Sequence, residues 1–206
     1  MSFDNYGSDF IGVVPPIFKY ENASELNPRL YDIISRFESF PVIGPNGESG
    51  GSKSAEVNLH KKGIGEINVL LSWINELIPK VAHYYSIPEH IPFDKEDYID
   101  VIDHGGGKYN FNIDSFKLVH CWSVLYNKGD GVEIHNHFPY AISFAYYVNT
   151  PKGSSSIIIE GEEIKPESGE VIFFPGNAFH SVPLNNVNGR CVIVGNVMYE
   201  NILDEY

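Results

Sequence analysis

The spacing of apolar and polar positions changes near the middle of the chain. In the first half, Asn27 and Pro28 form a cap and first-turn pair, and apolar residues follow them at helical spacing. A second apolar stripe predicts a helix over residues 65–85, with a kink or break at Pro79. Residues 44–54 are rich in Gly and Ser and predict a surface loop. The first half therefore indicates mixed helix and loop.

The second half has short stretches rich in Val, Ile, Tyr and Phe, separated by Gly, Pro, Asn or Ser. The strands that this pattern predicts are residues 98–103, 116–127, 131–137, 140–149, 155–160, 170–174 and 190–199. Seven or eight short strands in about 100 residues are typical of an antiparallel sandwich or jelly roll. We expect a single domain over 1–206, in which a helical and loop buttress (1–97) supports a β core (98–206).

Composition and charge narrow the classes of partner. The 206 residues include 27 acidic and 14 basic side chains, a net charge of −13. Such a field repels phosphate backbones and anionic membranes, so we expect neither nucleic-acid nor membrane binding. Residues 1–20 do not have the pattern of a signal peptide, and no apolar run is long enough to span a bilayer. Two cysteines, Cys121 and Cys191, make no disulfide framework, which favours the reducing cytoplasm.

Three of the eight histidines have a spacing that indicates a metal site. His135 and His137 are two residues apart on a predicted strand, so alternation sends both imidazoles to one face. His180 follows an apolar strand 43 residues later, and a jelly roll can bring the two segments together. Three neutral imidazoles suit iron, zinc, copper or nickel. Surface or packed histidines are the alternative interpretation.

Arg190 is the second candidate residue. It opens the last long strand and shares a face with Val192, Val194 and Asn196. An arginine on an otherwise apolar, inward face is costly unless it meets an anion. That anion is either a ligand or one of the chain's own carboxylates.

These residues carry a resemblance to a known family. The stretch from Tyr126 through Gly129 to His135 and His137 resembles the pattern of the prolyl-hydroxylase branch of iron(II)/2-oxoglutarate oxygenases. The segment 169–175, His180 and Arg190 resembles that superfamily's distal histidine and the basic residue about ten positions beyond it. More narrowly, the chain resembles an oxygenase subfamily of marine bacteria and their phages that has His-x-His where most relatives have His-x-Asp. The residues that carry this narrower resemblance are His135, His137, Ser143, Tyr146, Tyr147, Val148 and Pro151.

The resemblance implies a double-stranded β-helix, a cupin-like jelly roll, with iron(II) held by His135, His137 and His180. The cosubstrate 2-oxoglutarate would chelate the iron and place its far carboxylate on Arg190, whose planar fork of donors fits a carboxylate bidentately. Tyr126 would hydrogen-bond the cosubstrate, unless it is an ordinary core tyrosine. The implied activity is that of a dioxygenase that uses O2, hydroxylates a substrate and releases succinate and CO2.

One position departs from the superfamily's pattern. The usual ligand set is two histidines and one carboxylate, and here His137 takes the place of the carboxylate. Glu133 has the right strand parity but precedes His135, and Asp130 lies in a Gly-Asp-Gly turn, so both rank below His137 as the third ligand.

His120 is expected to be a packed histidine, with a role in the substrate pocket as the alternative.

Two other functions stay open at this point. One is a cupin-type, three-histidine metal dioxygenase that does not use 2-oxoglutarate and places its own substrate's carboxylate on Arg190. The other is a metal-free jelly-roll protein with a binding or structural role, for instance in a virion. The sequence does not specify the primary substrate or the oligomeric state, and a homo-oligomer is one of the possible states.

Overall fold

The structure is a computed structural model that describes residues 14–43, 49–54, 58–86 and 116–199. Its helices are α1 (Ala23–Ser35), the short 3-10 helix η1 (Leu59–Lys61) and α2 (Gly65–Ser86). Its strands are β1 (Ile17–Lys19), β2 (Ser39–Ile43), β3 (Ser49–Ser54), β4 (Phe116–Tyr126), β5 (Val132–His135), β6 (Ile142–Asn149), β7 (Ile157–Ile159), β8 (Glu162–Ile164), β9 (Glu170–Pro175), β10 (His180–Val182) and β11 (Arg190–Tyr199).

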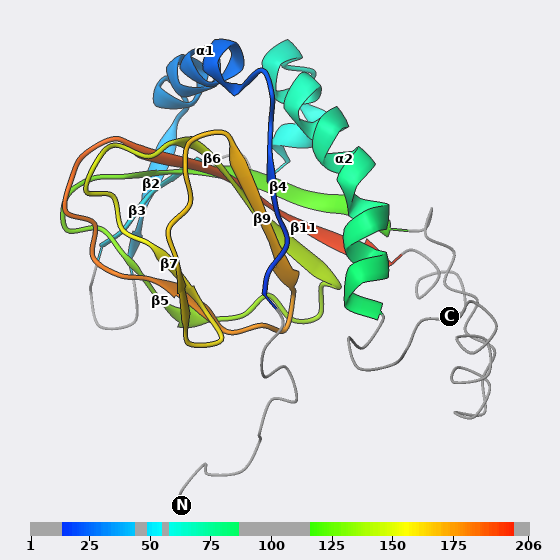
Figure 1. Cartoon of the computed structure of the whole chain (residues 1–206). Coiled ribbons are helices and arrows are strands. Elements are labelled where there is room, and N and C mark those ends of the chain that lie inside the picture. The colour runs from blue at the N-terminus through cyan, green and yellow to red at the C-terminus, as the bar shows by residue number, and fades with distance from the viewer. Residues whose placement is uncertain (1–13, 44–48, 55–57, 87–115, 200–206) are drawn as a thin grey trace, which may run out of the picture.

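The strands form two antiparallel sheets that face each other (Figure 1). The large sheet has seven strands in the order β1-β9-β6-β11-β4-β3-β2, and the small sheet has four in the order β5-β10-β7-β8. Strand β11 lies between β4 and β6, and its register pairs Arg190 with Tyr126. This is the architecture of the predicted jelly roll.

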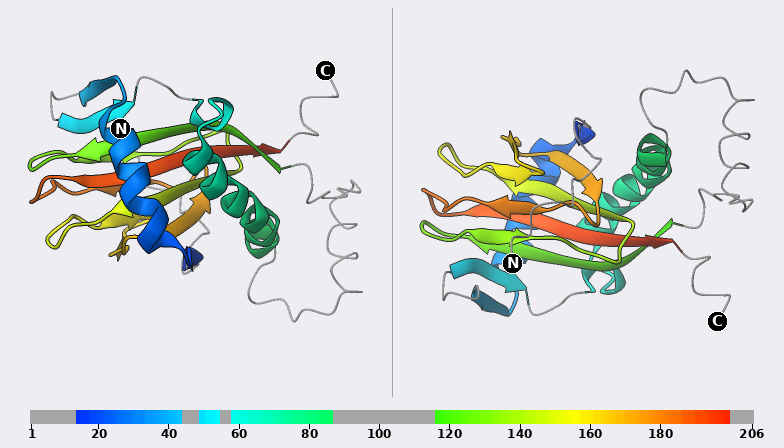
Figure 2. Two further views of the ribbon diagram at one scale, coloured as in Figure 1. Left: turned by 90° about the horizontal axis from the view of Figure 1, so that it is seen from above. Right: turned by 90° about the horizontal axis from the view of Figure 1, so that it is seen from below.

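The helices cover the outer face of the large sheet (Figure 2). Side chains of α1 and α2, such as Leu30 and Ile74, form one apolar core with the outward-facing residues of the sheet, such as Tyr146 and Ile193. Burial of that face stabilises both layers, because apolar area removed from water contributes about 25 cal/mol per Å². Among the described helices, none has the length and apolar character needed to cross a membrane.

A second apolar cluster lies between the two sheets. The inward-facing residues of β4, β6 and β11 meet those of β7, β9 and β10 there, among them Val124, Ile159 and Val192. Strand alternation separates the two cores: Cys191 and Ile193 face the helices, whereas Arg190 and Val192 face the other sheet.

Three expectations for the first half need correction. Helix α1 begins at Ala23 with Asn22 as its cap, so Asn27 and Pro28 lie inside the helix; the buried Asn27 side chain accepts a hydrogen bond from the Tyr146 hydroxyl at 2.6 Å. The break expected at Pro79 as the alternative to a kink is absent, because helix α2 continues to Ser86 with its apolar face packed on the sheet. The expected loop 44–54 contains strand β3, which pairs with β2 and β4, and residues 44–48 lie outside the described residues.

The second half follows the prediction more closely. The strand expected at 190–199 has those bounds, and the other predicted strands from residue 116 onward are present with ends shifted by a few residues. The strand expected at 131–137 ends at His135, so His137 lies beyond it. The strand predicted at 98–103 lies outside the described residues. Strands β1 to β3 show that the first half also contributes to the large sheet.

Candidate metal centre

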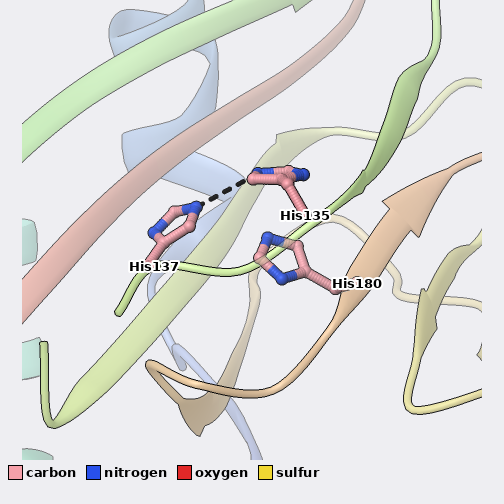
Figure 3. A group of neighbouring side chains, drawn as sticks. All are labelled: His135, His137 and His180. Atoms are coloured by element: carbon pink, nitrogen blue, oxygen red, sulfur yellow. Dashed lines mark hydrogen bonds between the residues drawn. The ribbon is translucent and has the colours of Figure 1, made fainter. Parts of the chain in front are cut away.

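His135, His137 and His180 lie together at one end of the space between the sheets (Figure 3). One ligand atom from each histidine lies within 4.8 Å of the other two. Strand pairing explains two of the three positions, because His180 on β10 is the direct partner of His135 on β5. His137 reaches the cluster from the segment after β5, where its backbone N–H donates to the carbonyl of Gly176 at 2.6 Å.

The hydrogen bonds of the rings orient the three histidines. His135 Nδ1 donates to the carbonyl of Glu133 at 2.8 Å, and His180 Nδ1 donates to the carbonyl of Ala178 at 3.1 Å. His137 Nδ1 lies 2.6 Å from Oδ1 of Asn196. Because a carbonyl oxygen can only accept, the proton of the first two rings is on Nδ1, and Nε2 keeps the lone pair that a metal needs.

Distances within the cluster fit a bound cation. The Nε2 atoms of His135 and His137 are 3.2 Å apart, shown by the dashed line in Figure 3. Metal–nitrogen bonds of ~2.1 Å place two nitrogens about 3.0 Å apart at a right angle and about 3.4 Å apart at a tetrahedral angle. Two lone pairs at this separation repel each other unless a positive charge lies between them. The arrangement therefore suits a metal ion better than an empty pocket.

Burial keeps the third histidine neutral. Burial in the cavity is the main cause that lowers the pKa of His180, to about 3. A neutral imidazole is the form that ligates a metal, so protons do not compete for His180 at neutral pH.

The acidic alternatives for the third ligand are not in the cluster. Among the residues that the structure describes, the group that can hold a metal contains the three histidines and no carboxylate. Glu133 contributes its main-chain carbonyl to His135. Asp130 accepts from the backbone N–H of Asn127 at 2.6 Å, the turn role expected for it from the sequence.

A cavity of about 190 Å³ connects the histidines to Arg190. Residues from both sheets line it, and most are apolar: Trp122, Val124, Tyr126, Val132, His135, His137, Phe144, Ala145, Tyr147, Ile157, Phe174, His180, Val182, Arg190, Val192 and Val194. Its volume exceeds what a single ion needs and admits several water molecules or a small organic acid. The two candidate groups found in the sequence thus line one cavity.

Arg190 is 1% exposed, and the structure leaves part of its guanidinium unsatisfied. Its Nε and Nη1 atoms have no hydrogen-bond partner, and within the described residues it forms no ion pair with a carboxylate. The expected alternative, a pair with one of the chain's own acids, is therefore not observed there. Its guanidinium carbon lies 4.5 Å from the ring centre of Tyr126 and 5.4 Å from that of Tyr147.

Tyr147 is a site residue to which sequence reasoning gave no role. Its side chain is buried in the cavity, and its hydroxyl has no partner among the described residues. Burial raises the pKa of Tyr147 and of Tyr126, so both stay neutral hydrogen-bond donors. Arg190 and Tyr147 thus bring three donor atoms without a partner to the lining of one cavity, and a carboxylate could satisfy such donors.

His120 has a partner outside the cluster. Its Nδ1 lies 2.8 Å from the hydroxyl of Tyr140, with the two rings perpendicular. It shares a strand face with Trp122, whose ring stacks on His137 with centres 5.9 Å apart. His120 is therefore a packed histidine beside the cavity, as expected, and it is not a member of the metal group.

Comparisons with solved structures show that this architecture is the fold of the 2-oxoglutarate/iron(II) oxygenases. An oxidoreductase of that family from Burkholderia pseudomallei aligns with 91% of this chain and 86% of its own, at 14% identity and a TM-score of 0.55. A prolyl-4-hydroxylase from Pseudomonas putida aligns over 89% and 91%, at 14% identity and a TM-score of 0.55.

A third similar structure shows what this fold can hold. The epimerase SnoN, in complex with Fe3+, α-ketoglutarate and nogalamycin RO, aligns over 88% of this chain and 75% of its own, at 11% identity and a TM-score of 0.59. No protein-family model and no curated protein matches the sequence. The comparisons therefore establish the fold, and the function has to be argued from the site.

Proposed function

We propose that the protein is a non-haem iron(II)- and 2-oxoglutarate-dependent dioxygenase that hydroxylates a C–H bond of its substrate. One observation carries the proposal: a single buried cavity has three convergent imidazoles at one end and an unsatisfied guanidinium at the other. A site for a metal alone would not require a buried arginine, and a site for an anion alone would not require three histidines. A dianionic 2-oxo acid can meet both.

The residues present fit both groups. In their neutral forms His135 and His180 have the proton on Nδ1 and leave Nε2 for a metal, and His137 presents its Nε2 to the same cluster. Arg190 offers N–H groups without a partner at Nε and Nη1, and its planar fork of donors suits a carboxylate. The hydroxyl of Tyr147 supplies a further donor, and the ring of Tyr126 stacks on the guanidinium and holds its plane.

When bound, iron(II) supplies the activation of O2, coupled to oxidation of 2-oxoglutarate to succinate and CO2. The protein's part is to orient and to exclude water. Arg190 and Tyr147 fix the far carboxylate, so the 2-oxo acid end points at the histidines. The apolar walls, with Val124, Val192 and Phe174, keep bulk water away from the reacting atoms.

The histidine in place of the usual carboxylate changes the charge of the site. Three neutral imidazoles leave the iron site one unit more positive than two imidazoles and a carboxylate. The extra positive charge strengthens the attraction for a dianionic cosubstrate, since Coulomb interactions are strong in a buried site.

A reducing, cytoplasmic setting is part of the proposal, because it keeps the iron reduced and the buried thiols Cys121 and Cys191 free.

The three-histidine set also favours a second candidate, a cupin-type metal dioxygenase that does not use 2-oxoglutarate. The observation behind it is that no carboxylate joins the cluster within the described part of the chain. In such an enzyme Arg190 would hold the carboxylate of the substrate itself. The two candidates differ in whether 2-oxoglutarate reaches the metal.

Anaerobic titration of the iron(II)-loaded protein with 2-oxoglutarate tests the proposal. We expect a visible charge-transfer band of a chelated 2-oxo acid, and release of succinate and CO2 when O2 is admitted. The matched ligand 2-oxopentanoate, which lacks the far carboxylate, should give the band only at higher concentration. Iron binding without any band would favour the second candidate. Protein that binds no iron would contradict both and favour a metal-free jelly roll.

A further inference from the structure

The three candidate metal ligands differ in what holds them. The Nδ1 atoms of His135 and His180 donate to main-chain carbonyls, which the two strands fix and which can only accept. The Nδ1 atom of His137 meets a side-chain amide, that of Asn196. An amide has an oxygen that accepts and a nitrogen that donates. The protonation of His137 therefore depends on which of the two faces it.

In the structure the oxygen of the Asn196 amide faces His137, inside a buried group that includes Ser143. Asn196 is 4% exposed and Ser143 is 1% exposed, and the two residues are direct partners on β11 and β6. The hydroxyl of Ser143 donates to Oδ1 of Asn196 at 2.9 Å and lies 3.3 Å from Nδ1 of His137. The same oxygen lies 2.6 Å from Nδ1 of His137, and because an amide oxygen only accepts, this contact places a proton on Nδ1.

The ring of His137 is also fixed in its plane. Trp122 stacks on it with an interplanar angle of 28°, so the ring cannot swing away from Asn196 without losing that contact. A proton on Nδ1 leaves the lone pair on Nε2, the atom that lies 3.2 Å from His135 Nε2. The reversed amide would place its NH2 against Nδ1 and move the proton to Nε2, where it would block a metal.

We propose that Asn196 is a positioning residue that holds His137 in the Nδ1-protonated form, which leaves Nε2 free to bind the metal. A carboxylate ligand at this position would not need a hydrogen bond to select its form, because a carboxylate has no tautomers. The hydroxyl of Ser143 donates to the same amide oxygen. The proposal rests on the metal site of the proposed function, but its test reads the proton position of His137 in metal-free protein. Hydrogen-bond partners of metal-bound histidines affect metal affinity about 10- to 100-fold when removed.

The test is a long-range 1H–15N correlation spectrum of metal-free protein labelled on its histidine nitrogens, recorded at a pH at which the imidazoles are neutral. The signals of His137 are assigned as those that disappear in His137→Gln. We expect His137 to carry its proton on Nδ1 in the wild type. In Asn196→Leu the proton should move to Nε2, and iron(II) affinity should fall about 10- to 100-fold. Asn196→Asp offers only acceptors, so it should restore the wild-type proton position and most of the affinity.

Asn27→Leu is the matched control. It removes another buried amide that accepts a 2.6 Å hydrogen bond, on the helix side of the sheet, and should leave the His137 signals and iron affinity unchanged. A proton on Nε2 in the wild type overturns the proposal, as does an unchanged spectrum in Asn196→Leu. If Asn196→Leu does not fold, the wild type and Asn196→Asp decide alone, because a reversed amide predicts that Asp changes the spectrum.

The outcomes separate this inference from the proposed function. A wild type with the proton on Nδ1 that binds no iron would contradict the function and leave the positioning role intact. A wild type that binds iron and 2-oxoglutarate with the proton on Nε2 of His137 would contradict the positioning role alone.

Discussion

The two ends of the cavity are built differently. At the histidine end, Nδ1 of each ring has a hydrogen-bond partner within the protein. At the arginine end, Nε and Nη1 of Arg190 and the hydroxyl of Tyr147 have none among the described residues. The protein thus fixes the orientation of its candidate metal ligands before a metal arrives, and it leaves donors at the other end for a ligand to satisfy. An unsatisfied buried cation costs stability, which is the usual sign of a binding role.

Removing a ligand at the histidine end should have the largest effect. His180→Ala takes away one of three imidazoles, and we expect iron(II) affinity to fall by more than ~100-fold, beyond the effect of losing a hydrogen-bond partner. Metal content after anaerobic loading and desalting measures it. His60→Gln, which changes a histidine on η1 outside the cluster, is the control and should load like the wild type. Full loading of His180→Ala would require a different ligand set.

His137 tests the one departure from the usual ligand set. His137→Ala should lose most of its iron, whereas His137→Asp should still bind iron(II) and accept 2-oxoglutarate, because a carboxylate is a common ligand at this position. Glu133→Ala should load normally, since its carboxylate is not in the cluster. Iron retained in His137→Ala and lost in Glu133→Ala would show that the carboxylate is the third ligand.

At the arginine end of the cavity, one substitution should weaken ligand binding and at the same time raise the stability of the free protein. Arg190→Met removes a charge-assisted, bidentate contact of about 1.5–3 kcal/mol, so 2-oxoglutarate affinity should fall about 10- to 100-fold while iron affinity stays the same. Without ligand, the variant should be more stable, since an apolar side chain replaces an unsatisfied buried charge. About 1 kcal/mol corresponds to a rise of about 2–4 °C in the thermal midpoint.

Both measurements on Arg190→Met have a contradicting outcome. Unchanged 2-oxoglutarate affinity would remove Arg190 from the cosubstrate site. A lower thermal midpoint would show that the guanidinium is satisfied in the free protein and that the contrast between the two ends is wrong.

Tyr147→Phe should have the smallest effect. It deletes one neutral donor, worth about 0.5–1.5 kcal/mol, so 2-oxoglutarate should bind about 2- to 10-fold more weakly. Tyr146→Phe, a change of the neighbouring residue that faces the helices, is the control and should leave cosubstrate affinity unchanged. Equal effects of the two changes would mean that the Tyr147 hydroxyl does not reach the ligand.

The sequence predicted the strands where alternation and composition agree. Strand β11 was predicted with its observed bounds, because Val and Ile alternate there with few breaking residues. The Gly- and Ser-rich β3 was predicted as a loop, since only its pairing with β2 and β4 makes it a strand. Helix α1 begins four residues before Asn27, because tertiary packing and the bond from Tyr146 outweigh the local preference of the Asn-Pro pair.

Part of the candidate site was also predictable from strand alternation. Two-residue spacing suggested that His135 and His137 share a face, and they meet in the structure although the strand ends between them. The role of Tyr147 could not be separated from that of Tyr146, because adjacent residues of one type give no sign of which faces the cavity. Its parity with Ser143 on β6 was the available signal. The pairing of Asn196 with Ser143 depends on strand register, which the sequence does not specify.

The central claim is that one small molecule bridges the two ends of the cavity. Calorimetric titration of 2-oxoglutarate into metal-free and into anaerobic iron(II)-loaded protein tests it most directly. If the same ligand touches both ends, loading with iron should raise 2-oxoglutarate affinity at least ~10-fold, and 2-oxoglutarate should raise iron affinity by the same factor. Equal 2-oxoglutarate affinity with and without iron would show that the histidine cluster and Arg190 bind independently, and would contradict the account.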